Sequence, residues 1–330
     1  MKIFPFLFPL MLLTQPAFSQ EQPVTYAEKL GFPKGAKVVI FHVDDAGMSA
    51  ESNAGTIQAL EKGIAGSTSV MMPCGWVPQF MDYLKKHPAV DAGVHLTLTA
   101  EWDTYRWQPL TGNNPKSGLC DDQGVFWHSV PQVVEHATAE AVEVEMRAQI
   151  ARYRGFGLEP THLDSHMGTL FQPKFLPGYL KVGITEKIPV LFPGGHATLA
   201  AQTNNMSDGQ RTLAKQVGQQ LWNAGLPVLD DLHGDSYGWS LPAGTPVTDE
   251  NLRKLKTDKY IELLTACQPG ITYVIMHCTD PTPNFDQITT SGPTRKGDLL
   301  AMTDPRLRAF VKQQGIIVTT WRELSERRKR

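Results

Sequence analysis

Short apolar runs alternate with longer amphipathic stretches along almost the whole of this 330-residue chain. Each apolar run is about the length of one buried strand, and most stretches between two runs are long enough for a helix. This alternation is typical of β/α units, in which helices join parallel strands. Seven or eight such units follow one another without a linker, a low-complexity tract or an internal repeat. The pattern predicts a single α/β domain that forms an irregular (β/α) barrel.

The same pattern gives the positions of the expected elements. We expect strands at residues 37–43, 67–72, 90–98, 161–163, 188–192, 227–232, 271–277 and 316–320. Helices are expected at residues 53–62, 77–86, 132–153, 173–182, 209–224 and 249–266, with a short basic helix at the C-terminus. The Trp- and Gly-rich stretch 101–128 shows little periodicity, and a loop of this length in a compact domain is usually functional or capping.

The first residues have the pattern of a secretory signal peptide. Lys2 gives a short positive region, residues 3–13 are apolar, and Ala17-Phe18-Ser19 offers the small residues that a signal peptidase reads. The alternative is a membrane anchor, but the apolar run is too short to span a bilayer and is interrupted by two prolines. We therefore predict that residues 1–19 are removed, that the barrel domain covers residues 20–330, and that the protein is exported to the periplasm or the medium without a membrane span.

The charge of the chain gives no reason to expect a nucleic acid or an anionic membrane as partner. Its formal net charge is −2 at pH 7, whereas binding to either usually needs a basic face. A weakly charged or uncharged small molecule or oligosaccharide fits better as a ligand. The sequence carries no prediction of the oligomeric state.

The four cysteines show no CxxC pair and no zinc-finger spacing. They are Cys74, Cys120, Cys267 and Cys278. In an exported protein they could form up to two disulfides, and burial as free thiols is the alternative. Neither is favoured, and no cysteine is indicated as a nucleophile.

Histidine or aspartate stands at the ends of four apolar runs, where the strands of a barrel carry their catalytic groups. The first of these motifs is His42-Val43-Asp44-Asp45-Ala46-Gly47. Adjacent carboxylates on a strand point in different directions, so a metal could hold one ionised while the other takes a proton from water. The alternative is an Asp helix cap with a turn, for which Gly47 and Ser49 are suitable.

The next two motifs contain imidazoles. His95 lies in an apolar run that begins at Val90, and it is either a metal ligand or a buried structural histidine. His162, Asp164 and His166 alternate along the chain, so the period of two places them on one face of an extended strand. This cluster indicates metal binding, with one member available to hydrogen-bond a ligating imidazole. A polar loop is the alternative.

The fourth motif is the strand end at His277, which follows the apolar run from Tyr273. Its imidazole is either a general acid or base near neutral pH, or a structural histidine. Because a barrel brings its strand ends to one mouth, the four motifs together favour a catalytic site over four separate structural roles.

These motifs, in their order along the chain, resemble the YdjC-like carbohydrate deacetylase family, which includes chitooligosaccharide deacetylases and hopanoid-biosynthesis deacetylases. The matching segments are residues 43–49, Asn53, 63–69, 93–99, 162–166, 276–277, 303–305 and 321–324. They span nearly all of the chain after the predicted signal peptide. The resemblance implies an irregular β/α barrel related to the NodB polysaccharide deacetylases.

The resemblance also implies the chemistry, which is the metal-dependent removal of an acetyl group from a saccharide, with N-acetyl favoured over O-acetyl. One divalent ion, zinc or magnesium, would be bound by Asp45, His95 and His166. Asp44 matches the proposed general base, and His277 matches the suspected general acid. His162 and Asp164 match the motif and are interpreted as hydrogen-bonding supports for the ligands.

Two departures from the family pattern bear on the substrate. Ala46 stands where many relatives have Phe, and Met167-Gly168 stands where many have further histidines. Aromatic residues of the long loop are candidates to stack on sugar rings, and packing the loop down is their alternative role. These residues are Trp102, Tyr105, Trp107 and Trp127.

Two other function classes fit parts of the pattern. A metal-dependent phosphoesterase also uses Asp and His, but it usually needs a second metal or basic phosphate clamps, and neither is visible beside these motifs. A non-catalytic carbohydrate-binding protein on the same scaffold would have no use for Asp44 and His277, and both are present.

Overall fold

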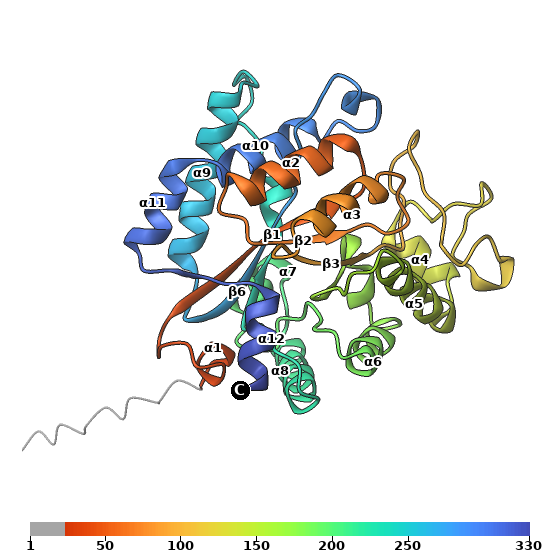
Figure 1. The fold of residues 1–330 in the computed structure, drawn as a ribbon, viewed down its shortest axis with the longest axis horizontal. Coiled ribbons are helices and arrows are strands. Elements are labelled where there is room, and N and C mark those ends of the chain that lie inside the picture. The colour runs from red at the N-terminus through yellow and green to blue at the C-terminus, as the bar shows by residue number, and fades with distance from the viewer. Residues whose placement is uncertain (1–23) are drawn as a thin grey trace, which may run out of the picture.

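The computed structural model describes residues 24–330, so the predicted signal peptide at residues 1–19 lies outside the described residues. A parallel sheet occupies the centre of the molecule and helices surround it (Figure 1). The strands pair in the order β4-β3-β2-β1-β6-β5, and β7 pairs with the amino-terminal half of β1. The strands are β1 (Lys37–Ala46), β2 (Ser67–Val70), β3 (Asp91–Leu96), β4 (Leu163–Ser165), β5 (Asp231–His233), β6 (Gly270–Met276) and β7 (Ile317–Val318).

The sheet curls into a barrel whose closure between β4 and β5 is irregular. Single parallel bridges join Leu163 to Val190 and Pro193 to Leu229, in place of a continuous ladder. Residues 188–192, which were expected to form a strand, therefore contribute only isolated pairing. Prolines within and just after this segment cannot donate to a ladder. The prediction of an irregular (β/α) barrel is confirmed.

Twelve α-helices lie among the described residues, most of them on the outside of the sheet. They are α1 (Tyr26–Lys29), α2 (Ala50–Glu61), α3 (Val77–Lys86), α4 (Val130–His136), α5 (Ala139–Gly155), α6 (Leu176–Glu186), α7 (Thr198–Asn204), α8 (Asp208–Asn223), α9 (Asp249–Ala266), α10 (Gly292–Met302), α11 (Pro305–Gln313) and α12 (Trp321–Lys329). Short 3₁₀ helices are η1 (Pro115–Ser117), η2 (His166–Phe171), η3 (Asp235–Gly238) and η4 (Phe285–Gln287).

The single helix expected at residues 132–153 is wrong, because the chain forms α4 and α5 there. Ala137 ends α4 in an extended conformation. The hydroxyl of Thr138 then accepts the backbone N–H of Ala141 and caps α5. The apolar periodicity continues across this break, whereas the local capping bond ends one helix and starts the next.

Strand β1 shows how the barrel positions a site. Its residues after Lys37 are all buried, as expected for a central parallel strand covered on both faces. Val39 and Phe41 pack with the outer helices, whereas Val38 and Ile40 pack with a cluster that includes Trp321. The even-numbered residues therefore form an inward row, and the strand ends at the mouth of the barrel.

Helix α12 covers the opposite, amino-terminal end of the barrel. The backbone N–H groups of Trp321 and Arg322 donate to the Asp91 carboxylate at the start of β3. The Trp321 ring is fully buried, and it stacks on His162 with a centroid separation of 5.3 Å.

Two predictions about the whole chain can be compared with the structure. Within residues 24–330, no helix combines the length and the apolar character needed to cross a bilayer. All four cysteines are free thiols, and Cys74, Cys267 and Cys278 are buried, whereas Cys120 is partly exposed. The structure therefore supports unpaired thiols, with burial at three of the four positions.

Candidate metal centre

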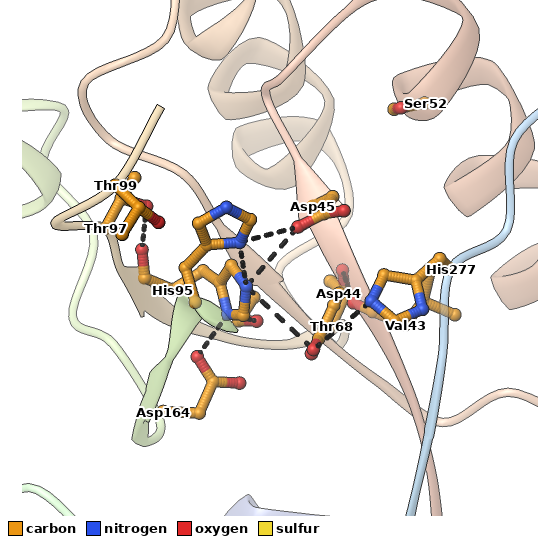
Figure 2. A network of polar contacts seen from close by, with 12 residues as sticks. Val43, Asp44, Asp45, Ser52, Thr68, His95, Thr97, Thr99, Asp164 and His277 are labelled. Atoms are coloured by element: carbon orange, nitrogen blue, oxygen red, sulfur yellow. Dashed lines mark hydrogen bonds and ion pairs between the residues drawn. The ribbon is translucent and has the colours of Figure 1, made fainter. Parts of the chain in front are cut away.

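The four sequence motifs meet at the carboxyl ends of their strands (Figure 2). Asp44 and Asp45 belong to β1, His95 to β3, and His277 directly follows β6. His166 directly follows β4, which carries Asp164. These side chains share the wall of one cavity of about 510 Å³. The expectation that a barrel mouth would bring them together is confirmed.

Three side-chain atoms converge closely enough to share one ion. Oδ1 of Asp45 lies 3.3 Å from Nε2 of His95 and 3.4 Å from Nδ1 of His166. The two nitrogens are 3.2 Å apart. Ligands bound to tetrahedral zinc at about 2.0–2.1 Å lie about 3.3–3.4 Å from one another. The spacing of Asp45, His95 and His166 therefore fits a single small divalent cation.

The hydrogen bonds and the ionisation of Asp45 also indicate that this residue can bind a cation. Its Oδ2 accepts a 2.7 Å hydrogen bond from Arg295, whereas the buried Oδ1 has no hydrogen-bond donor. Burial would raise the pKa of this carboxyl, but Arg295, with help from His166 and His95, holds the pKa well below its usual range. Oδ1 is thus a buried, ionised oxygen with an unused lone pair, as a metal ligand requires.

The backbone explains how two adjacent carboxylates reach one mouth. Strict alternation would point Asp44 and Asp45 to opposite faces of β1. The pairing of β1 with β2 is irregular between Val43 and Ala46, and Asp45 has a φ of 67°. This bulge redirects the second carboxylate toward the cavity. The suggested Asp helix cap is wrong, because Ser49 caps α2 instead.

Asp44 and His277 lie beside the candidate ligands. Oδ2 of Asp44 is 3.9 Å from Nε2 of His277 and 3.9 Å from Nε2 of His95. Burial lowers the pKa of His277, and Asp45 opposes that effect. A carboxylate and an imidazole thus flank the point at which the three ligand atoms converge.

Asp164 and His162 lie deeper in the barrel. Oδ1 of Asp164 accepts a 2.7 Å hydrogen bond from Nδ1 of His95, which is the usual carboxylate–imidazole support of a metal ligand. Oδ2 accepts from the hydroxyl of Tyr273. Nε2 of His162 is 3.6 Å from that oxygen, so His162 contacts Asp164 rather than a candidate ligand.

Three residues of the site were missed from the sequence. Nε2 of His42 lies 3.1 Å from both Asp44 and Asp164, and its place two residues before Asp44 was the available signal. Glu101 accepts from His166 at 3.0 Å. Glu101 is the first residue of the loop 101–128 and Arg295 lies on helix α10, so neither belongs to a strand-end pattern.

The aromatic residues of the long loop have different positions. Trp102 lines the cavity. Trp107 is 5% exposed and donates its indole N–H to the carbonyl of Thr99. Trp127 stacks on His136. Trp102 is therefore the one of the three tryptophans that faces the cavity, and η3 contributes Tyr237 to the same wall.

The fold and the site define a class of protein, namely the (β/α) barrels with an Asp/His/His cluster at the carboxyl ends of the strands. Within that class, the chain belongs to the family described as YdjC-like protein, whose sequence model matches residues 38–313. This match spans all four motifs.

Individual proteins agree with this assignment. A carbohydrate deacetylase from Thermus thermophilus is 31% identical over 91% of this chain and 97% of its own length. A chitooligosaccharide deacetylase from Yersinia enterocolitica is 30% identical over 43% of this chain and 53% of its own length. A solved structure from Enterococcus faecalis, described as a cellobiose-phosphate cleavage protein, has a TM-score of 0.69 at 19% identity. It covers 88% of this chain and 99% of its own, which shows a common fold.

Proposed function

We propose that this protein is a metal-dependent carbohydrate deacetylase that hydrolyses an acetyl group, preferably N-acetyl, from a saccharide or glycoconjugate. The observation that carries the proposal is the convergence of Asp45, His95 and His166 beside the Asp44 carboxylate and the His277 imidazole. Membership of the YdjC-like family and the naming of its relatives as carbohydrate deacetylases support it.

The residues present can be assigned to the steps of amide hydrolysis. A divalent ion held by the three ligands would polarise the acetyl carbonyl and acidify a water molecule. Oδ2 of Asp44 takes a proton from the attacking water, and Nε2 of His277 gives a proton to the departing amine. The C–N bond breaks, a C–O bond forms, and the products are acetate and the free amine. Two imidazoles and one carboxylate suit zinc well, and magnesium is the alternative.

The cavity favours a neutral sugar over a phosphate ester. Asp44, Asp45, Glu101 and Asp235 contribute carboxylates to its wall. Arg295 is the one Lys or Arg side chain among the described lining residues, and it is already paired with Asp45. A phosphoesterase would need additional cationic groups at this position. Trp102 and Tyr237 offer aromatic faces on which a sugar ring can stack.

The export of the protein is part of the proposal. It rests on the signal-peptide pattern of residues 1–19, and it places the substrate in the periplasm or outside the cell.

The test is acetate release from N-acetylchitooligosaccharides before and after removal of metal with EDTA. We expect release that stops with EDTA and returns with added Zn²⁺ or Mg²⁺. Asp44→Asn should lower kcat by roughly 10²- to 10⁴-fold, the usual contribution of a general base, with the metal content unchanged. Asp82→Asn, at an exposed Asp paired with Lys86, is the matched control and should leave kcat intact. Full activity in Asp44→Asn rejects its role as base, and activity insensitive to EDTA rejects the metal.

A further inference from the structure

Each candidate imidazole ligand has a carboxylate on the side of its ring that faces away from Asp45. Asp164 accepts from Nδ1 of His95 at 2.7 Å. Glu101 lies 3.0 Å from Nε2 of His166. The first contact joins two strand ends, whereas the second comes from the first residue of the loop 101–128. Nothing in the sequence motifs or in the family resemblance assigns a role to Glu101.

These contacts fix where the ring protons lie. An ionised carboxylate only accepts hydrogen bonds, so the nitrogen that faces it must carry a proton. At 3.0 Å, the Glu101 carboxylate accepts a hydrogen bond from Nε2 of His166. Nδ1 of His95 and Nε2 of His166 are therefore the protonated nitrogens. The lone pairs of neutral rings remain on Nε2 of His95 and Nδ1 of His166.

Those two nitrogens are the ones that face Oδ1 of Asp45, at 3.3 and 3.4 Å. From this agreement we infer that Glu101 is a positioning residue for the metal centre, which orients His166 so that its Nδ1 faces the cation. The inference rests on the proposed metal site. It implies that the two imidazoles bind through different nitrogens, Nε2 for His95 and Nδ1 for His166.

Glu101 also connects the metal centre to the substrate wall. Trp102, the next residue, lines the cavity, and the Arg295 guanidinium lies 5.7 Å from the centroid of its ring. Arg295 in turn binds Oδ2 of Asp45. The start of the loop thus contacts His166 directly, and it contacts Asp45 through Arg295. These contacts connect the cavity wall at Trp102 with two of the three candidate ligands.

The loop has a second anchor that makes a matched control possible. Glu145 of α5 is fully buried and accepts the backbone N–H groups of Leu110 and Thr111 at 3.0 and 2.9 Å. It holds the same loop but has no contact with His166 among the described residues. A variant of Glu145 therefore separates loosening of the loop from loss of the carboxylate at His166.

The experiment measures the Kd for Zn²⁺ by competition with a chromophoric chelator, without any sugar present. We expect Glu101→Ala to weaken binding by roughly 10- to 100-fold, the usual effect of removing such a support. Glu101→Gln should lie between this variant and the wild type, because its amide oxygen still accepts but carries no charge. Glu145→Gln should lower the melting temperature and change the Kd by less than about threefold. Wild-type affinity in both Glu101 variants, or equal weakening in Glu145→Gln, overturns the inference.

Nitrogen-15 NMR of the histidine rings in the zinc-loaded protein gives an independent readout. We expect one ring coordinated through Nδ1 and one through Nε2, and coordination of both through Nε2 overturns the inference. Neither measurement involves acetate release. If the protein shows both effects but releases no acetate, the proposed function is wrong, whereas the role of Glu101 at the metal centre still holds.

Discussion

The pKa values of single residues at this site depend on the charges that are buried around them. Asp45 is 1% exposed and has Arg295, His95 and His166 within hydrogen-bonding or ion-pair distance. Burial by itself would lower the pKa of His166, but the carboxylates of Glu101 and Asp45 raise it to about 9. Burial would likewise lower the pKa of His95, yet Asp44 and Asp164 raise it well above its ordinary value. Without metal, both imidazoles therefore hold a second proton more tightly than an ordinary histidine does.

This protonation makes the affinity for metal depend on pH. A cation can bind only after His95 and His166 have each lost one proton, because a ligating imidazole needs a free lone pair. Below about pH 9 we expect log Kd for Zn²⁺ to rise by between one and two for each unit by which the pH falls, as one or two protons are displaced. Calorimetry at pH 7 in buffers of different ionisation enthalpy counts these protons. Binding without proton release contradicts the prediction.

The helices outside the barrel support the strand end that carries His277. Oδ2 of Asp298, on α10, accepts the backbone N–H of His277 at 3.0 Å. Oδ1 pairs with Lys256 of α9 at 2.9 Å, and both side chains are at most 1% exposed. Two neighbouring helices therefore bury an ion pair directly behind the candidate acid.

Removing one charge of this pair should destabilise the protein strongly. Asp298→Asn leaves Lys256 buried without its counter-ion, and we expect the free energy of unfolding to fall by about 3–5 kcal/mol. Lys256→Met added to this variant should recover part of the loss, because the unpaired charge is then gone. Chemical denaturation measures these changes. Asp82→Asn breaks an exposed pair and should change the free energy of unfolding by less than about 1 kcal/mol. A similar small change in Asp298→Asn would show that the buried pair contributes little.

At the scale of the whole molecule, the two ends of the barrel differ: one carries the cavity and the other is closed. The carboxyl ends of the strands form the open cavity, whereas α12 covers the amino ends, with Trp321 fully buried there. On this closed side, α12 contacts the segment that follows α1, where the Arg327 guanidinium lies 3.9 Å from the centroid of the Phe32 ring. Helix α1, the first of the described helices, thus lies at the end of the barrel away from the cavity.

Export is a prediction about the whole chain. When the full sequence is expressed in a bacterium, we expect the periplasmic or secreted protein to have the mass of residues 20–330, because signal peptidase removes the segment before Gln20. Mass spectrometry of cell fractions tests this. A version without residues 2–19 should stay in the cytoplasm. An uncleaved chain in the cytoplasm would contradict both the signal peptide and the extracellular substrate.

The sequence by itself determined the features that depend on local pattern. Apolar periodicity identified the β/α units, and the ends of the apolar runs placed His95, Asp164 and His277 at the mouth of the barrel. The period of two put His162, Asp164 and His166 on one face of their strand. These predictions were possible because alternation within one strand is a property of neighbouring residues. At Thr138 a single capping hydrogen bond interrupts the apolar periodicity, and the periodicity therefore predicted one helix where the chain forms two.

Only the tertiary structure decided which distant residues complete the site. Arg295 reaches Asp45 across 250 positions of the chain, and Glu101 reaches His166 across 65. Packing also turned Trp127 away from the cavity and left Trp102 in its wall. No local pattern marks such contacts, because they arise when separate elements pack together and a buried charge must find its partner.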